Sequence, residues 1–286
     1  MIHLALVLLA VLVGGGLRGR PRPDGGWCGR WNAALVQLLV PGLLFATTAA
    51  TILWMGTPGV AAWRWDGVAA YWLSAAWWVY ALAVGAGHSW SCARAVRAAR
   101  ALPVASVAGH RARLLDEGTP YIALVGFWQP QLVCTSGLVA SMGGAQLGAV
   151  LAHEQAHRHY RDTFWFFWLG WTHRATAFLP HSEALWQELL ALRELRADRH
   201  AARSVDGLLL AEALVALAGA GRLPAATAFA AAVYSRGERL SERVEALIAP
   251  EDERQAQRGG VWGWLPVGLL PLLTWPLHGL AQHLCP

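Results

Sequence analysis

The chain has 286 residues, of which 56% are hydrophobic and only 14% are charged, whereas soluble domains carry about 25% charged residues. This composition argues against a disordered protein, a small disulfide scaffold and a soluble nucleic-acid-binding domain. The mean hydropathy of +0.36 predicts a membrane protein with one modest polar domain.

Four apolar runs along the chain predict membrane-spanning helices. They cover residues 2–17, 32–55, 67–90 and 261–280. The last run contains Pro266 and Pro271, which spans tolerate when neighbouring helices satisfy the freed carbonyl groups. We therefore predict three transmembrane helices within residues 1–90, and a fourth helix with a short tail within residues 261–286.

The distribution of arginine predicts how these helices are oriented, because positively charged loops stay in the cytoplasm. The loop after the first run carries four arginines, whereas the 56–66 loop carries only Arg64. We expect residues 91–260 to lie on the cytoplasmic side of the cell membrane (the plasma or inner membrane), with both termini outside. This placement explains the basic pI near 9.4 without nucleic acid as a partner.

Residues 91–260 hold 16 of the 18 acidic residues and have the length of a domain. Short strands are predicted at 121–125 and 131–135, and helices at about 145–161, 182–203, 208–219 and 238–249. The expected fold is therefore a mainly α multi-pass membrane protein with a cytoplasmic α+β domain between the third and fourth spans.

The first helix of this domain contains the motif His153-Glu154-Gln155-Ala156-His157. Two histidines four residues apart lie on one helix face and can bind the same ion, and Glu154 can act as a general base toward water. Zinc suits this set, because it accepts imidazole and carboxylate ligands and lowers the pKa of bound water to about 7. The alternative is two surface histidines on an amphipathic helix. The apolar residues 147–152 favour a buried helix instead, in which unpaired polar side chains would be costly.

A catalytic zinc ion needs a third protein ligand, and spacing alone leaves five candidates. They are Glu183, Glu188, Glu194, His173 and His181. Glu194 and Asp198 form an i, i+4 carboxylate pair, which makes sense if Glu194 binds a cation and Asp198 accepts a hydrogen bond from a ligating histidine. The alternative is an ordinary charged surface helix, in which Arg193, Arg196 and Arg199 pair with these acids.

Residues from about 121 to 247 resemble the membrane-bound gluzincin peptidases. The similarity is greatest to the M56 family, the antirepressor sensor-transducers of the β-lactam response, and lower to the related M48 family. The similar segments are residues 126–133, 147–162 (LGAVLAHEQAHRHYRD), 194–198 (ELRAD) and 240–247.

The resemblance covers under half of the chain and implies a role for six residues. It implies one zinc ion per chain, bound by His153, His157 and Glu194, with Glu154 as the catalytic base. It also implies that Asp162 and Asp198 contact the ligating side chains without binding the zinc ion. Three spans are implied before the zinc domain and one after it.

The chain departs from these families in two respects. It ends at Pro286, soon after the fourth predicted span, so we expect no extracellular penicillin-binding domain and no direct β-lactam binding. M48 peptidases often have a histidine-proline pair upstream of the segment that corresponds to Arg243, and this pair is missing here. Arg243 is therefore expected either to contact the transition state or to form a structural ion pair with Glu238 or Glu194.

Residues 163–180 are apolar and aromatic enough to be mistaken for a span. A single crossing there would place His157 and Glu194 on opposite sides of the bilayer, where they could not share an ion. We therefore expect this segment either to lie in the membrane interface or to pack against the other spans.

These features together predict a zinc metalloendopeptidase that cleaves a protein or peptide at the cytoplasmic membrane face. The M56 resemblance implies regulated proteolysis of a cytosolic transcriptional repressor. The alternative is a non-catalytic, zinc-containing signalling or scaffold subunit. Glu154 favours the enzyme, because a structural metal site has no need of a base beside its ligands.

Overall fold

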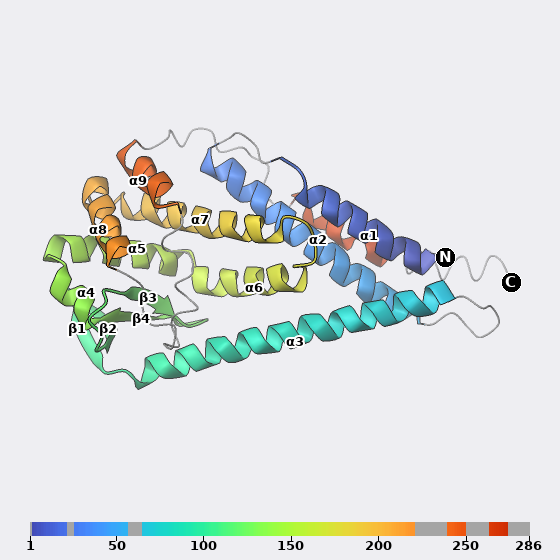
Figure 1. The fold of residues 1–286 in the computed structure, drawn as a ribbon, viewed down its shortest axis with the longest axis horizontal. Helices are drawn as coiled ribbons and strands as arrows, with labels where there is room; N and C mark the ends of the chain where they lie inside the picture. Colours follow the sequence, from blue (N-terminus) through green and yellow to red (C-terminus); the bar gives the residue numbers. More distant parts are fainter. Residues whose placement is uncertain (1, 22–25, 57–64, 221–238, 250–262, 274–286) are drawn as a thin grey trace. The chain divides into compact units, whose positions relative to one another are not determined.

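The computed structural model describes residues 2–21, 26–56, 65–220, 239–249 and 263–273, which form a mostly helical protein with one small sheet (Figure 1). The chain divides into two compact units. Unit 1 comprises Met1–Gly87, Leu169–Leu189 and Gln255–Pro286, and unit 2 comprises His88–Trp168 and Leu190–Arg254. The boundary falls inside three helices, α3 (Trp65–Ala101), α6 (Asp162–Ala175) and α7 (Ser182–Ala201).

Unit 1 contains the apolar helices of the chain. Both α2 (Trp27–Met55) and the Gly67–Ala101 part of α3 are long and apolar enough to cross a membrane, and α1 (Ile2–Arg18) is a shorter apolar helix. In the fourth predicted span, the described residues form the short helix α10 (Leu265–Leu269) and the 3-10 turn η4 (Leu270–Leu273), and the rest of that span lies outside the described residues. The structure therefore contains two candidate membrane spans, and the four-span arrangement stays a prediction.

Within unit 1, the aromatic segment after Leu169 packs against α2 and α3. The indole nitrogen of Trp171 donates to the carbonyl of Ala81 (2.7 Å), and that of Trp77 donates to Ala175 (3.1 Å). A Cβ atom at Gly42 would lie only 2.6 Å from the Thr172 methyl group, so α6 approaches the α2 backbone closely. These contacts favour packing over an interfacial position for this part of the segment.

Unit 2 is built on a four-stranded sheet with the order β1-β2-β4-β3. The strands are β1 (Val104–Val107), β2 (His110–Leu115), β3 (Ile122–Val125) and β4 (Gln131–Thr135). The two predicted strands, β3 and β4, are confirmed as an antiparallel pair, and β2 runs parallel to β4. The β1–β2 hairpin was not predicted. Its two-residue turn, Ala108-Gly109, has positive φ at both positions, which hairpin turns require but alanine seldom adopts.

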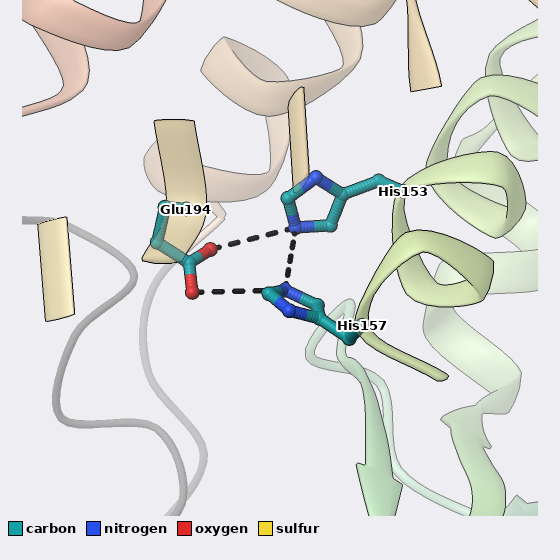
Figure 2. A group of neighbouring side chains, drawn as sticks. All are labelled: His153, His157 and Glu194. Carbon is teal, nitrogen blue, oxygen red and sulfur yellow. Dashed lines mark hydrogen bonds and ion pairs between the residues drawn. The ribbon is translucent and has the colours of Figure 1, made fainter. Parts of the chain in front are cut away.

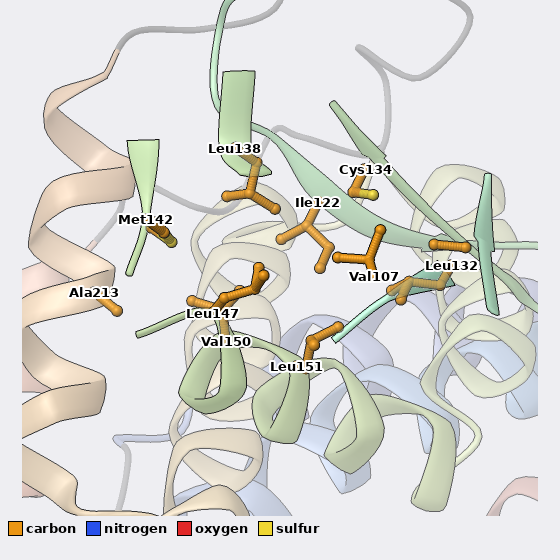
Figure 3. Packing of buried hydrophobic residues seen from close by; sticks show 11 residues of the cluster. Val107, Ile122, Leu132, Cys134, Leu138, Met142, Leu147, Val150, Leu151 and Ala213 are labelled. Atoms are coloured by element: carbon orange, nitrogen blue, oxygen red, sulfur yellow. The ribbon is translucent and has the colours of Figure 1, made fainter. Parts of the chain in front are cut away.

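Helices cover both faces of this sheet, so that the site-bearing helix becomes buried. One face packs against the end of α3 through residues such as Ala99, Tyr121 and Val133. The other packs against α5 (Gly144–His159) and α8 (Gly207–Gly219), and Figure 3 shows this core, with Ile122 facing Leu147 and Val150. The helix α9 (Leu240–Ile248) packs against α8. The four helices predicted within residues 91–260 are thus present to within a few residues. The helix α4 (Ser136–Ser141) was not predicted.

The start of α4 provides a test of this packing. A Cβ atom at Gly137 would lie 2.0 Å from the carbonyl oxygen of Gly118, whereas one at Gly148, inside α5, would meet nothing within 4 Å. We expect Gly137→Ala to destabilise the protein by about 1–3 kcal/mol through overpacking, and Gly148→Ala to stabilise it by about 0.5–1 kcal/mol through helix propensity. Thermal unfolding in detergent should therefore show Tm shifts of opposite sign, and equal shifts would contradict this backbone contact.

Candidate metal centre

Two helices of unit 2 bring three possible metal ligands together. His153 and His157 lie one turn apart on α5, and Glu194 projects from α7 (Figure 2). The two histidine Nε2 atoms are 3.1 Å apart, and the carboxylate oxygens of Glu194 lie 3.4 Å from Nε2 of His153 and 3.6 Å from Nε2 of His157. One ligand atom from each residue lies within 4.8 Å of the other two, so this buried group could hold a metal ion.

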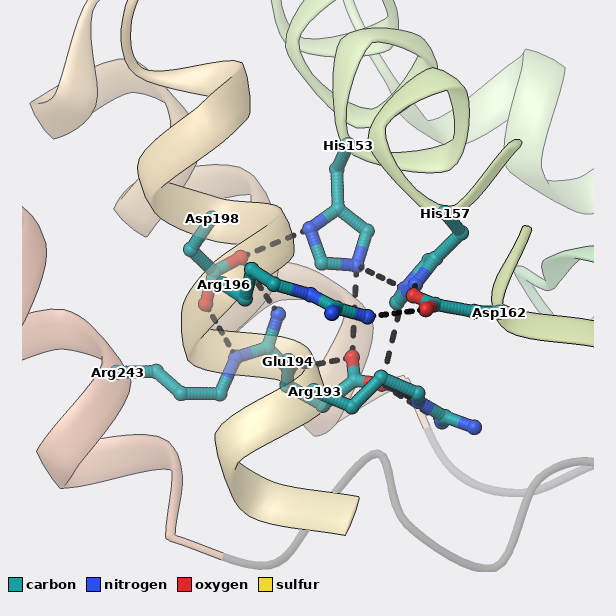
Figure 4. Close-up of polar contacts among 8 residues, drawn as sticks. All are labelled: His153, His157, Asp162, Arg193, Glu194, Arg196, Asp198 and Arg243. Atoms are coloured by element: carbon teal, nitrogen blue, oxygen red, sulfur yellow. Dashed lines mark hydrogen bonds and ion pairs between the residues drawn. The ribbon is translucent and has the colours of Figure 1, made fainter. Parts of the chain in front are cut away.

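The second nitrogen of each imidazole faces a carboxylate (Figure 4). Nδ1 of His157 lies 2.7 Å from Asp162 Oδ2 in a hydrogen bond, and Nδ1 of His153 lies 2.8 Å from Asp198 Oδ1. The latter contact is close but off the direction of the N–H bond, since it does not meet hydrogen-bond geometry. The hydrogen bond to Asp162 assigns a proton of the His157 imidazole to Nδ1, because a carboxylate oxygen can only accept.

This assignment leaves electron pairs facing one another. The neutral His157 ring then presents Nε2 as an acceptor toward the oxygens of Glu194, with Nε2 of His153 3.1 Å away, so that a proton or a cation is needed among these three groups. A divalent metal ion accepts electron pairs from all three at once. The donor set fits zinc, which takes imidazole nitrogen and carboxylate oxygen and whose ligating histidines usually donate their other N–H to a carboxylate.

The acids of this site are buried, which overturns both surface alternatives. Glu194 and Asp198 are each 1% exposed, and His153 and Glu154 are each 3% exposed. The α7 segment that carries the two acids is therefore no ordinary surface helix, and the histidine motif does not lie on an exposed face. Buried carboxylates are tolerated only when they are paired or bind a cation.

Three arginines compensate these acids. Arg193 donates to Glu194 Oε1 from Nε (2.9 Å) and Nη2 (2.7 Å), and Arg196 donates to Asp162. Of the arginines expected to pair with Glu194 and Asp198 on a surface helix, Arg193 does pair with Glu194, whereas Arg196 pairs with Asp162 instead. Four buried carboxylates, with Glu154 included, face three guanidinium groups, so the cluster has an excess of negative charge that a metal cation would offset.

Arg243 of α9 forms the strongest of these ion pairs. It donates to both oxygens of Asp198, at 2.6 and 2.8 Å, and its Nη1 lies 3.5 Å from Glu194 Oε2. Of the two partners considered from the sequence, Glu194 is thus a near neighbour, and Glu238 lies outside the described residues. Asp198 was not predicted as the main partner, because 45 residues separate it from Arg243 and only the packing of α9 joins them.

The pKa values reflect this balance. Burial raises the pKa of Glu194, but Arg193 and the two histidines lower it by more, so the carboxyl pKa lies well below its ordinary value. Burial also raises the pKa of Asp198, but Arg243 and His153 lower it by more, so the pKa lies below its ordinary value. Both groups are therefore charged, as metal binding requires.

The pKa of His157 shows that the site attracts positive charge. Burial lowers it, yet Glu194 and Asp162 outweigh burial and raise it to about 9 in the absence of an ion. The pKa of Arg243 is also raised: burial opposes, while Asp198, Glu194 and Glu154 favour the charged form. Glu154 therefore lies close enough to act on the same guanidinium group that holds Asp198.

Three of the other candidates for the third ligand have different partners within unit 1. Glu188 pairs with Arg30 at 2.7 Å. The carboxylate of Glu183 is 71% exposed and lies 3.6 Å from His173. Among the described residues, only His153, His157 and Glu194 bring three such ligand atoms together, and the geometry therefore selects Glu194 from the five candidates.

Comparison of the chain with known protein families, with curated proteins and with solved structures finds no match. The peptidase resemblance therefore stays a prediction from the motifs, and the case for a metal centre depends on the geometry described above.

The third ligand can be tested by metal analysis. We expect Glu194→Ala to lower bound zinc from near one per chain to a small fraction, because two imidazoles alone bind weakly. Glu183→Ala is the matched control, since it removes an exposed carboxylate from the same helix and should leave the metal content unchanged. Full occupancy in purified Glu194→Ala, measured by mass spectrometry of the metal, would contradict this ligand assignment.

Proposed function

We propose that the chain is a membrane-embedded zinc metalloendopeptidase that cleaves a protein or peptide substrate at the cytoplasmic face of the membrane. One observation carries this proposal. His153, His157 and Glu194 direct three ligand atoms at one buried point, and the buried carboxyl group of Glu154 comes from the next residue after a ligand. Three protein ligands leave a coordination position open for water or substrate, which is typical of catalytic zinc.

The residues divide the chemistry of peptide hydrolysis among them. Zinc, when bound by His153, His157 and Glu194, supplies a Lewis acid that polarises the scissile carbonyl group. Glu154 accepts a proton on its carboxylate from the attacking water and later donates it to the nitrogen of the leaving amine. Asp162 holds the His157 ring by its Nδ1 contact, so that Nε2 stays free to bind the metal.

The sheet of unit 2 supports a peptide substrate. β3 lies at the edge of the sheet, paired only with β4 among the described strands. An extended peptide can add to such an edge through main-chain hydrogen bonds. The resemblance to antirepressor peptidases suggests a cytosolic transcriptional repressor as the substrate.

The presence of Glu154 distinguishes this proposal from a zinc-containing scaffold. A structural zinc site has four protein ligands and excludes water. Here three ligands come together among the described residues, and a buried acid that is not one of them stands beside His153. A scaffold would have no use for an uncoordinated carboxyl group whose burial is costly.

The cytoplasmic location of the site can be tested with reporter fusions. The arginine-rich first loop favours four spans with residues 91–260 inside the cell. We therefore expect a reporter fused at Gly259 to behave as cytoplasmic and one fused at Pro286 to behave as external. An external signal from Gly259 would rule out both this orientation and a cytosolic substrate.

The proposed base can be tested by Glu154→Gln. This change keeps the size of the side chain but removes its ability to take a proton, so zinc content and folding should persist. Peptide-bond cleavage should fall by at least the roughly 10²–10⁴-fold that general acid–base catalysis contributes. The measurement compares membrane and cytosolic proteomes of cells that express the wild type or the variant, and quantifies fragments specific to the wild type.

His153→Ala is the matched control for this experiment, because it should lose zinc and cleavage together. A fragment that is absent from cells without the protein, but appears with both the wild type and Glu154→Gln, would exclude the mechanism. If neither the wild type nor Glu154→Gln produces such a fragment and the phenotype is the same, the scaffold alternative holds instead.

A further inference from the structure

A pocket of about 420 Å³ lies in unit 2, beside the corner where α5 meets α6. The β3–β4 turn forms one wall, with Phe127, Trp128 and Pro130, and the α5–α6 corner forms the other, with Arg158, Arg161 and Phe164. Its volume is at the lower end of the range for sites that bind small ligands, and it is large enough for one or two amino-acid side chains.

The pocket adjoins the candidate metal centre along the chain. Arg158 directly follows the ligand His157, and Arg161 directly precedes Asp162, which holds the His157 ring. The pocket and the candidate metal centre are therefore built on consecutive residues at the α5–α6 corner.

One wall of the pocket is aromatic. The ring of Phe164 lies 4.9 Å from that of Phe127 and 5.0 Å from that of Trp128, measured between centroids. Trp128 is 74% exposed, so a large apolar surface remains open to a ligand. Gly126 shapes the turn that presents these rings: its φ is +140°, and a Cβ atom there would lie 3.0 Å from Cα of Pro130.

The pocket is also positively charged. Two guanidinium groups line it, and none of its lining residues is acidic. Arg158 donates one hydrogen bond to the carbonyl of Pro130 (3.2 Å), which holds the guanidinium against the turn and leaves its other N–H groups for a ligand. The nearest acid in sequence, Asp162, is already engaged by His157 and Arg196.

We propose that this pocket binds a carboxylate side chain of the substrate together with a neighbouring large apolar residue, and so selects which protein segments reach the metal centre. This inference rests on the proposed peptidase function. A peptide is favoured over a lipid headgroup, because the pocket is large enough for one or two amino-acid side chains and two of its residues adjoin His157 and Asp162 in the chain. The arginines bind the carboxylate, and the aromatic wall binds the apolar neighbour.

The test measures binding without cleavage. Full-length Glu154→Gln protein, loaded with zinc in neutral detergent, is titrated into three rhodamine-labelled decapeptides that differ only in a central Phe-Glu, Phe-Gln or Ala-Glu pair. Fluorescence anisotropy should show that the Phe-Glu peptide binds on the order of tenfold more tightly than either of the others. A higher salt concentration should reduce the difference in affinity between the Phe-Glu and Phe-Gln peptides.

The variants Arg158→Gln and Arg161→Gln should each reduce the preference for Phe-Glu over Phe-Gln to about twofold or less, with zinc content unchanged. Arg111→Gln is the matched control, because it removes an exposed arginine of β2 outside the pocket and should keep the preference. Loss of the preference in Arg161→Gln alone also supports the proposal, since that change leaves the Arg158–Pro130 bond intact.

Two outcomes would overturn the proposal. One is equal binding of the three peptides. The other is displacement of the peptides by monomeric short-chain phosphatidylglycerol but not phosphatidylcholine in an Arg158-dependent way, which would assign the pocket to lipid headgroups. Failure of the proposed function is distinct: the peptide preference would then persist although the wild type cleaves nothing.

Discussion

His153, His157 and Glu194 bring two imidazole nitrogens and a carboxylate to one point in a part of the protein from which water is almost excluded. Such an arrangement is stable only with positive charge at its centre, and in the absence of an ion the site draws that charge from a proton on His157. The other elements of unit 2 surround this site. The sheet and its covering helices bury α5, and α7 brings the carboxylate to meet it.

Burying this cluster also requires that the carboxylates of Asp162 and Asp198 be paired with positive charges. Arg196 holds Asp162, and Arg243 holds Asp198, which in turn faces His153. A buried acid that lost such a partner would destabilise the fold by several kcal/mol. The ion pair from Arg243 therefore ties α9 to α7 and links the position of a short helix to the orientation of a metal ligand.

Residues at the corner between α5 and α6 contribute both to the candidate metal centre and to the adjoining pocket. Its inner side carries His157 and Asp162, which converge on the metal centre, and its outer side carries Arg158 and Arg161, which line the pocket. Arg161 adopts a positive φ of 53° at the turn, which lets α6 begin at once after α5 ends. A substrate bound in the pocket would thus be positioned by the same few residues that orient a ligand.

The local features of this protein follow from short stretches of its sequence. Spacing of four residues places His153 and His157 on one helix face whatever surrounds them, and the apolar residues before them predicted a buried helix. The strands β3 and β4 followed from their composition and the turn between them, and the apolar runs at 2–17, 32–55 and 67–90 predicted α1, α2 and most of α3.

The remaining features depend on contacts between residues distant in sequence, so local patterns could not predict them. Five residues were candidates for the third ligand until the packing of α7 against α5 selected Glu194. The Arg243–Asp198 pair spans 45 residues and has no local signal. The hairpin of β1 and β2 turns through an alanine with positive φ, which propensity argues against and the paired strands impose.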